Sequence, residues 1–410
     1  MADQPPVELY LHIPFCVRKC SYCDFYSFPA GEAEFQNYTD RICAAMKYYF
    51  ERPGLAGRPV SSVYFGGGTP TVLGAGRLIE ILEAARAAAP FLPDAEITTE
   101  TNPGVGTDFA ALKRAGFNRL SIGLQSAERD ELSALGRIHT AADAEETFRR
   151  AREAGFQNLS LDVMLGVPYQ TEESLCRTLD FCGRLAPEHI SAYLLKIEDG
   201  TPLAASPLRD SCADPDTAAA LYELAVELLG ALGYQRYEIS NFAKPGFESR
   251  HNLGYWLGAE YLGLGPSAHS LLGGRRFYFD RSYRDFMEKD FSEAELEEGP
   301  PEAASAPSAD IPVGGAPSAD IPVGGAPSAD IPVGGWEEFA MLRLRLERGL
   351  SLAELSERFA DAPPAAEIAG RAARLAAHGL CELQGGTVRL TTKGFLLSNP
   401  VTAELLYNDA

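Results

Sequence analysis

The sequence has 410 residues, of which 46% are hydrophobic and 23% charged, and this composition is ordinary for a soluble globular protein of two or three domains. Its 57 acidic and 36 basic residues give a formal net charge of −21. Such an excess argues against nucleic acid as the main partner, because phosphate groups would repel it. No stretch predicts a membrane span or a secretory signal, so we expect a cytoplasmic protein.

Short β-branched and apolar runs alternate with helical patterns from residue 7 to about residue 197. Repeated strand-then-helix units predict an α/β fold with a parallel sheet, either open or closed into a barrel. Six units are too few for a complete eight-fold barrel. The six strands are expected over residues 7–13, 60–67, 95–102, 119–125, 158–166 and 189–197.

Three cysteines, Cys16, Cys20 and Cys23, follow the first predicted strand within eight residues. Three thiolates can hold three corners of a four-iron four-sulfur cluster and leave the fourth iron open to a small molecule. A structural zinc site would need a fourth ligand, and His12 and Cys43 are poorly spaced to provide one. A disulfide framework is disfavoured because 8 cysteines in 410 residues is a low density.

The spacing CxxxCxxC is the signature of radical S-adenosylmethionine (SAM) proteins, and the flanking residues extend the match. The stretch YLHIPF before the first cysteine and CDF at the last resemble the coproporphyrinogen oxidase-like branch of that superfamily, in particular its HemW-type haem chaperones. The resemblance implies an incomplete (β/α)6 barrel that binds a 4Fe-4S cluster through the three cysteines and SAM beside it. It also covers the closing stretch TTKGFLLSNPVTAELL.

Polar and glycine residues stand where the next strands end, and ligand sites in barrels lie at these carboxyl ends. The run 66–70, GGGTP, lets the backbone approach a ligand without Cβ clashes. Glu100 and Asp162 are carboxylates in otherwise apolar strands, so they need partners such as ribose hydroxyls, an ammonium or an arginine. A structural ion pair with Arg119 or Arg137 is the alternative.

The family resemblance implies a larger set of SAM-binding positions. Some of these positions serve a second SAM molecule in the oxidase, so the choice between one and two SAM sites stays open. The implied residues are Tyr10, Tyr22, Gly67, Gly68, Thr69, Glu100, Gln125, Arg137 and Asp162.

The composition changes near residue 290, where an acidic, proline-bearing segment leads into three identical copies of APSADIPVGG over 306–335. Sequence so rich in Pro, Gly, Ala and Ser cannot bury enough surface to offset chain entropy, which favours a linker over a solenoid. We therefore expect a partial barrel with a C-terminal extension over 1–290, a disordered linker over 291–335 and a winged-helix-like domain over 336–410.

Two functions fit the resemblance: a haem chaperone, and an oxygen-independent coproporphyrinogen III oxidase that forms protoporphyrinogen IX. Three features favour the chaperone. First, Asp24-Phe25 follows the last cluster cysteine, where the oxidases have Cys-Gly-Cys. Second, the motif begins at residue 10, without the oxidases' N-terminal extension. Third, residues 251–256, HNLGYW, match the chaperones' HNxxYW motif. An unrelated radical SAM enzyme is a third alternative, and the sequence leaves open whether the protein is an enzyme.

The HNxxYW match makes His251 the expected ligand of haem iron, with Tyr255 or Trp256 against the porphyrin face. His269 is a second candidate that could instead line the SAM pocket. The expected partners are haem, client haem proteins and an electron donor for the cluster.

Overall fold

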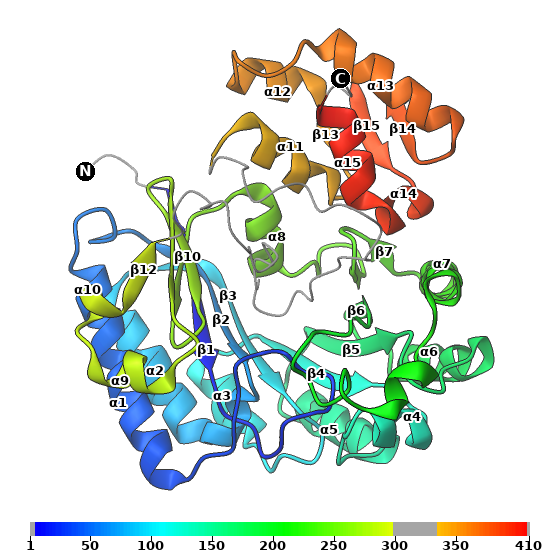
Figure 1. The fold of residues 1–410 in the computed structure, drawn as a ribbon. Helices are drawn as coiled ribbons and strands as arrows, with labels where there is room; N and C mark the ends of the chain where they lie inside the picture. The colour runs from blue at the N-terminus through cyan, green and yellow to red at the C-terminus, as the bar shows by residue number, and fades with distance from the viewer. Residues whose placement is uncertain (1–4, 298–333, 408–410) are drawn as a thin grey trace.

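The computed structural model describes residues 5–297 and 334–407, and its largest part is a twelve-stranded sheet (Figure 1). The strand order is β12-β11-β10-β9-β1-β2-β3-β4-β5-β6-β8-β7, in which β1 to β6 run parallel as consecutive neighbours. All six predicted strands are confirmed, although the third begins earlier and the sixth ends earlier than expected. They are β1 (Val7–Ile13), β2 (Val60–Gly67), β3 (Phe91–Thr101), β4 (Arg119–Gln125), β5 (Leu159–Leu165) and β6 (His189–Leu194).

Helices connect these strands and cover the outer face of the sheet (Figure 1). Apolar side chains of the strands, such as Leu9 and Leu11 of β1, pack with the helices in the main hydrophobic core. Side chains alternate along a strand, so the intervening residues Glu8, Tyr10 and His12 face the other way. The helices are α1 (Glu32–Phe50), η1 (Pro70–Leu73), α2 (Ala75–Ala88), α3 (Phe109–Ala115), α4 (Arg129–Ala134), α5 (Ala141–Glu153) and α6 (Glu172–Leu185).

The extension after β6 adds short strands at both edges of the sheet. At one edge β9 pairs in parallel with β1, followed by antiparallel β10, β11 and β12, and at the other β8 pairs antiparallel with β6. The elements are η2 (Pro207–Ser211), α7 (Pro215–Ala231), β7 (Gln235–Arg236), β8 (Asn241–Ala243), α8 (Arg250–Leu257), β9 (Tyr261–Leu264), β10 (His269–Leu272), β11 (Arg275–Phe279), α9 (Tyr283–Glu288), α10 (Phe291–Ala294) and β12 (Glu295–Glu297).

The start of the expected linker is wrong, because regular structure continues past residue 290 to Glu297. Phe291 is buried in the main core, and the Arg41 guanidinium lies 3.8 Å from its ring centroid. A large aromatic side chain within the acidic segment therefore anchors α10 to the barrel. The rest of the expected linker, residues 298–333, lies outside the described residues.

The C-terminal part has its own three-stranded sheet and a second hydrophobic core. The order helix, strand, two helices and hairpin, with strand order β13-β15-β14, is that of a winged helix. Trp256 of α8 joins this second core, so α8 lies between the barrel and the C-terminal helices (Figure 1). The elements are α11 (Trp336–Leu344), β13 (Leu350–Ser351), α12 (Leu352–Arg358), α13 (Ala365–Ala377), β14 (Cys381–Gln384), β15 (Thr387–Leu390), α14 (Thr392–Leu396) and α15 (Ser398–Leu406).

Across the part of the chain that the structure describes, no helix has the length and apolar character needed to cross a membrane.

Candidate functional site

The three cysteines lie in the loop after β1, at the carboxyl end of the parallel strands. The loop closes at its base, where the Cys16 N–H donates to the Phe28 carbonyl at 3.1 Å. Cys16 Sγ lies 3.5 Å from Thr69 Oγ1, and Arg137 donates from Nη1 to Cys20 Sγ at 3.4 Å. Two loops that are distant in sequence therefore contact the cysteine loop.

The three thiols of the cysteine loop lie near one another. Cys16, Cys20 and Cys23 are close enough for their charges to interact, and burial raises the pKa of Cys23 to about 12. Within residues 5–297 and 334–407, no three His, Cys, Asp or Glu side chains converge as one ion would require. Each cysteine of a four-iron cluster ligates a different iron, so its thiols need not meet at one point.

The glycine run brings a second loop against the cysteine loop. The Gly68 N–H donates to the Ile13 carbonyl at 2.8 Å, and the Thr69 N–H donates to the Phe15 carbonyl at 2.7 Å. A Cβ atom on Gly68 would lie 2.5 Å from that Phe15 carbonyl oxygen. Only glycine therefore allows the two backbones to approach this closely.

Gly68→Ala is expected to separate these two loops. Backbone atoms cannot move aside like a flexible side chain, so we expect a loss of about 1–3 kcal/mol in the free energy of unfolding and a lower iron content after reconstitution. Gly76→Ala is the matched control, because a Cβ there meets open space on α2. Anaerobic urea unfolding and iron analysis measure both effects, and wild-type values for Gly68→Ala would show that the close approach is unnecessary.

Two carboxylates face the inner side of the sheet near its carboxyl end. Glu100 Oε1 accepts a hydrogen bond from the Tyr64 hydroxyl at 2.8 Å, and Asp162 Oδ1 accepts one from Ser121 Oγ at 2.9 Å. Burial, reinforced by the charge of Asp162, raises the pKa of Glu100 to about 8. Burial also raises the pKa of Asp162. Arg119 influences both groups through its charge, and Glu100 also accepts a hydrogen bond from the backbone of Gly67.

Arg137 and Asn102 join the loops around this region. Arg137 donates from Nη2 to Asn102 Oδ1 at 2.7 Å and to the Gly123 carbonyl at 2.5 Å. Asn102 in turn donates from Nδ2 to Thr69 Oγ1 at 2.7 Å. The Nε of Arg137 is buried and has no partner in the described part of the chain, which leaves a donor for a bound ligand.

Other predicted SAM-binding residues lie in the same region. Gln125 ends β4 with a left-handed φ of 67°. Tyr22 lies close enough to Arg137 and Cys20 for their charges to influence the pKa of Tyr22. The Tyr10 hydroxyl and His12 Nδ1 are 3.0 Å apart on β1. Strands β1 to β5 and the loops that follow them thus carry Tyr10, Tyr22, Gly67, Gly68, Thr69, Glu100, Gln125, Arg137 and Asp162.

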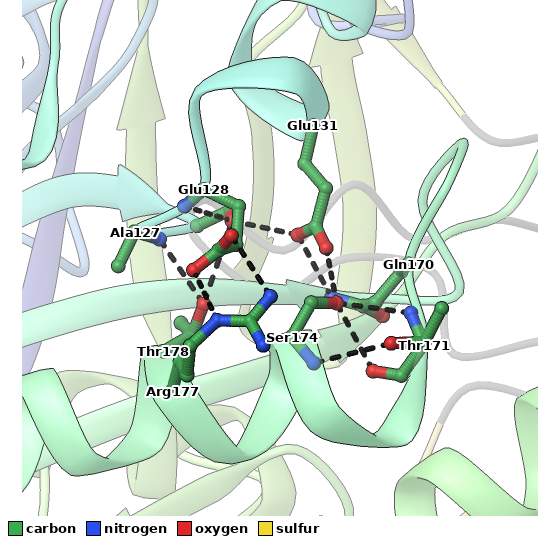
Figure 2. A network of polar contacts seen from close by, with 9 residues as sticks. Ala127, Glu128, Glu131, Gln170, Thr171, Ser174, Arg177 and Thr178 are labelled. Atoms are coloured by element: carbon green, nitrogen blue, oxygen red, sulfur yellow. Dashed lines mark hydrogen bonds and ion pairs between the residues drawn. The ribbon is translucent and has the colours of Figure 1, made fainter.

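A network of polar contacts joins α4 and the loop before it to α6 and the loop before it (Figure 2). Glu131 of α4 accepts hydrogen bonds from Ser126, Gln170 and Ser174. The carbonyl of Ala134, at the end of α4, accepts from Ser21 Oγ at 3.1 Å. The network therefore ties the loops after β4 and β5 to a residue between Cys20 and Cys23. No direct signal in the sequence pointed to Asn102 or Glu131, because their importance lies in tertiary contacts.

The structure places His251 at the other end of the sheet, against Ser62 near the start of β2. Its side chain is 0% exposed, with Nδ1 2.7 Å from Ser62 Oγ and Nε2 2.8 Å from the Tyr255 hydroxyl. Burial lowers its pKa to about 3. Both ring nitrogens thus have hydroxyl partners in this conformation, whereas an axial ligand of haem iron needs a free ring nitrogen, so the haem-ligand role of His251 stays a prediction. Tyr255 and Trp256 are also buried.

His269 begins β10, where its ring stacks on Tyr278 with centroids 5.1 Å apart. His269 lies close enough to His12 of β1 to influence the pKa of His12.

Comparison with known proteins relates the whole chain to one group. Residues 10–182 match the radical SAM superfamily, and residues 335–397 match the HemN C-terminal domain. The chain is 35% identical over 407 residues to the heme chaperone HemW of Mycobacterium tuberculosis, covering 98% of this chain and 95% of that protein. It is 40% identical over 272 residues to the heme chaperone HemW of Escherichia coli, and the match covers 66% of this chain and 71% of that protein.

Among solved structures, coproporphyrinogen III oxidase (HemN) of Escherichia coli superposes with a TM-score of 0.76, over 98% of this chain and 90% of that chain. The sequence identity is 22%, so this likeness concerns the fold.

Proposed function

The chain belongs to the radical SAM family that contains the heme chaperones HemW, and we propose that it binds haem and transfers it to client haem proteins. The observation that carries the proposal is the 35% identity to one such chaperone over 98% of this chain. The oxidase alternative has support from the fold alone, at 22% identity.

We further propose that Cys16, Cys20 and Cys23 hold a 4Fe-4S cluster and that SAM binds beside it. The mutual approach of the thiols and their contacts with Thr69 and Arg137 support the cluster. The cluster and SAM supply one-electron chemistry when bound. The chain's own residues orient the ligand: carboxylates accept from ribose hydroxyls or an ammonium, and the unpartnered Arg137 Nε donates.

To separate the chaperone from the oxidase, the anaerobically reconstituted protein is incubated with haem, and separately with coproporphyrinogen III, SAM and a reductant. We expect stoichiometric haem binding, seen as a shifted Soret band, followed by transfer to apomyoglobin as a generic acceptor. No protoporphyrinogen IX is expected. Free haem at the same concentration serves as the control for uncatalysed transfer. SAM-dependent decarboxylation without haem binding would replace the chaperone with the oxidase.

A further inference from the structure

The inner face of the sheet is polar along its whole length. Glu8 and Ser62 lie near the starts of β1 and β2, Tyr10 and Tyr64 are paired neighbours in the middle, and Glu100 lies near the end of β3. Parallel barrels usually fill this space with branched apolar side chains. Polar side chains therefore form a continuous row from the start of the strands to the carboxylates at their ends.

Helix α8, which carries the HNLGYW motif, is fixed against the start of this polar interior. Glu96 accepts hydrogen bonds from the backbone N–H groups of Arg250 and His251, both at 3.1 Å. A carboxylate at this end of a helix is favourable because it complements the helix dipole. Any side chain at Gly254 would overlap the carboxyl group of Glu8, so glycine allows α8 to pack this closely.

The imidazole of His251 lies directly against a residue that contacts Glu100. Its ring stacks on Tyr64, with centroids 5.2 Å apart and planes inclined by 23°. The Tyr64 hydroxyl donates to Glu100 Oε1 at 2.8 Å. The ring cannot rotate freely, because Ser62 and Tyr255 engage its two nitrogens.

We propose that His251 is a positioning residue: by stacking on Tyr64 it holds the Tyr64 hydroxyl against Glu100 and so orients that carboxylate for SAM. This inference rests on the proposed function, since it takes Glu100 as a SAM-binding residue. It gives the HNLGYW helix a role in the SAM site at the opposite end of the sheet. A neutral ring suits this role, and burial together with Arg119 keeps His251 neutral by lowering its pKa to about 3.

A double-mutant cycle with His251→Asn and Tyr64→Phe tests the proposal on the full-length, anaerobically reconstituted protein, with SAM binding measured by calorimetry. Asparagine keeps a polar group near Ser62 but has no ring to stack on Tyr64. Each single substitution is expected to weaken SAM binding about tenfold, because each loosens a hydrogen bond to a buried carboxylate. If His251 acts through the Tyr64 hydroxyl, the double variant binds no more weakly than Tyr64→Phe.

The matched control is His189→Asn. His189 is also 0% exposed, and its ring nitrogens lie 2.8 Å from Ser160 Oγ and 2.8 Å from the Tyr237 hydroxyl. Its ring pairs with Tyr237 instead of Tyr64. We expect a similar fall in melting temperature but SAM affinity within about twofold of wild type. A loss of SAM affinity in both histidine variants would show a general effect of the buried histidines and overturn the proposal.

His251→Phe separates stacking from stability, and it is the second variant if His251→Asn does not fold. A phenyl ring retains the contact with Tyr64 but leaves the Ser62 and Tyr255 hydroxyls without a partner. We expect lower stability than wild type but stronger SAM binding than in His251→Asn. SAM binding no stronger than in His251→Asn would contradict the stacking argument.

Glu100→Gln tests separately the premise that Glu100 binds SAM. Unchanged SAM affinity in this variant would remove Glu100 from the SAM site, whatever His251 does. Weaker binding in Glu100→Gln with wild-type binding in His251→Asn would overturn the positioning role and leave the proposed function standing. Loss of the haem Soret shift in His251→Asn, with SAM affinity unchanged, would assign His251 to haem iron instead.

Discussion

Single replacement of Cys16, Cys20 or Cys23 by alanine is expected to abolish the cluster and leave a colourless protein with almost none of the about four irons per chain. The loop is short and local, and two of its thiols already contact Thr69 and Arg137 from neighbouring loops. Losing one of three thiolates leaves two irons open, so the cluster has too few protein ligands to be retained. Iron and sulfide analysis with absorption spectra after anaerobic reconstitution measures the effect.

Cys43→Ala is the matched control, because Cys43 is a half-buried thiol on α1, away from the cysteine loop. It should keep a full cluster. A complete cluster in Cys20→Ala, or its loss in Cys43→Ala, would contradict the assignment of the three ligands.

The parallel strands were predictable because each is a run of apolar or β-branched residues long enough to show its own pattern. The short strands at the sheet edges were not, since β7 (Gln235–Arg236) and β12 (Glu295–Glu297) are defined by their pairing partners. The acidic composition around residue 290 suggested a linker, but composition does not reveal that one residue, Phe291, has an apolar pocket to fill.

The placement of candidate site residues at strand ends was predictable, because parallel strands bring their carboxyl ends to one edge. The cysteines, Gly68 and Glu100 belong to this class. Asn102 and Glu131 do not, since their importance comes from contacts with other loops. The haem-ligand interpretation of His251 stays a prediction for a related reason: a motif names the residue, but only the packing of α8 shows that both ring nitrogens have hydroxyl partners.

Glu100→Gln is expected to remove a pH dependence of SAM binding. The pKa of Glu100 is raised to about 8 by burial and by Asp162, so much of the free protein carries a neutral Glu100 at pH 7. A ligand that offers an ammonium or hydroxyl donors binds the ionised carboxylate more tightly. Wild-type affinity should therefore rise about tenfold between about pH 7 and about pH 9 relative to the variant. The ratio of the two affinities cancels the titration of SAM itself, and calorimetry at each pH measures both.

The raised pKa of Glu100 also affects stability: the free energy of unfolding changes with pH in the direction opposite to SAM affinity. The ordinary pKa of a glutamate is 4.5, so between that value and about 8 the folded protein holds a proton that the unfolded chain has released. The free energy of unfolding contributed by Glu100 is therefore present at low pH and is lost as the pH rises through 8. Glutamine stays neutral, so Glu100→Gln should gain stability relative to wild type as the pH rises, while it loses SAM affinity. Glu83→Gln, on an exposed side chain of α2, controls for the change in net charge. Parallel stability–pH curves for Glu100→Gln and wild type would show that Glu100 is ionised in the folded protein at neutral pH, and both pH predictions would then fail together.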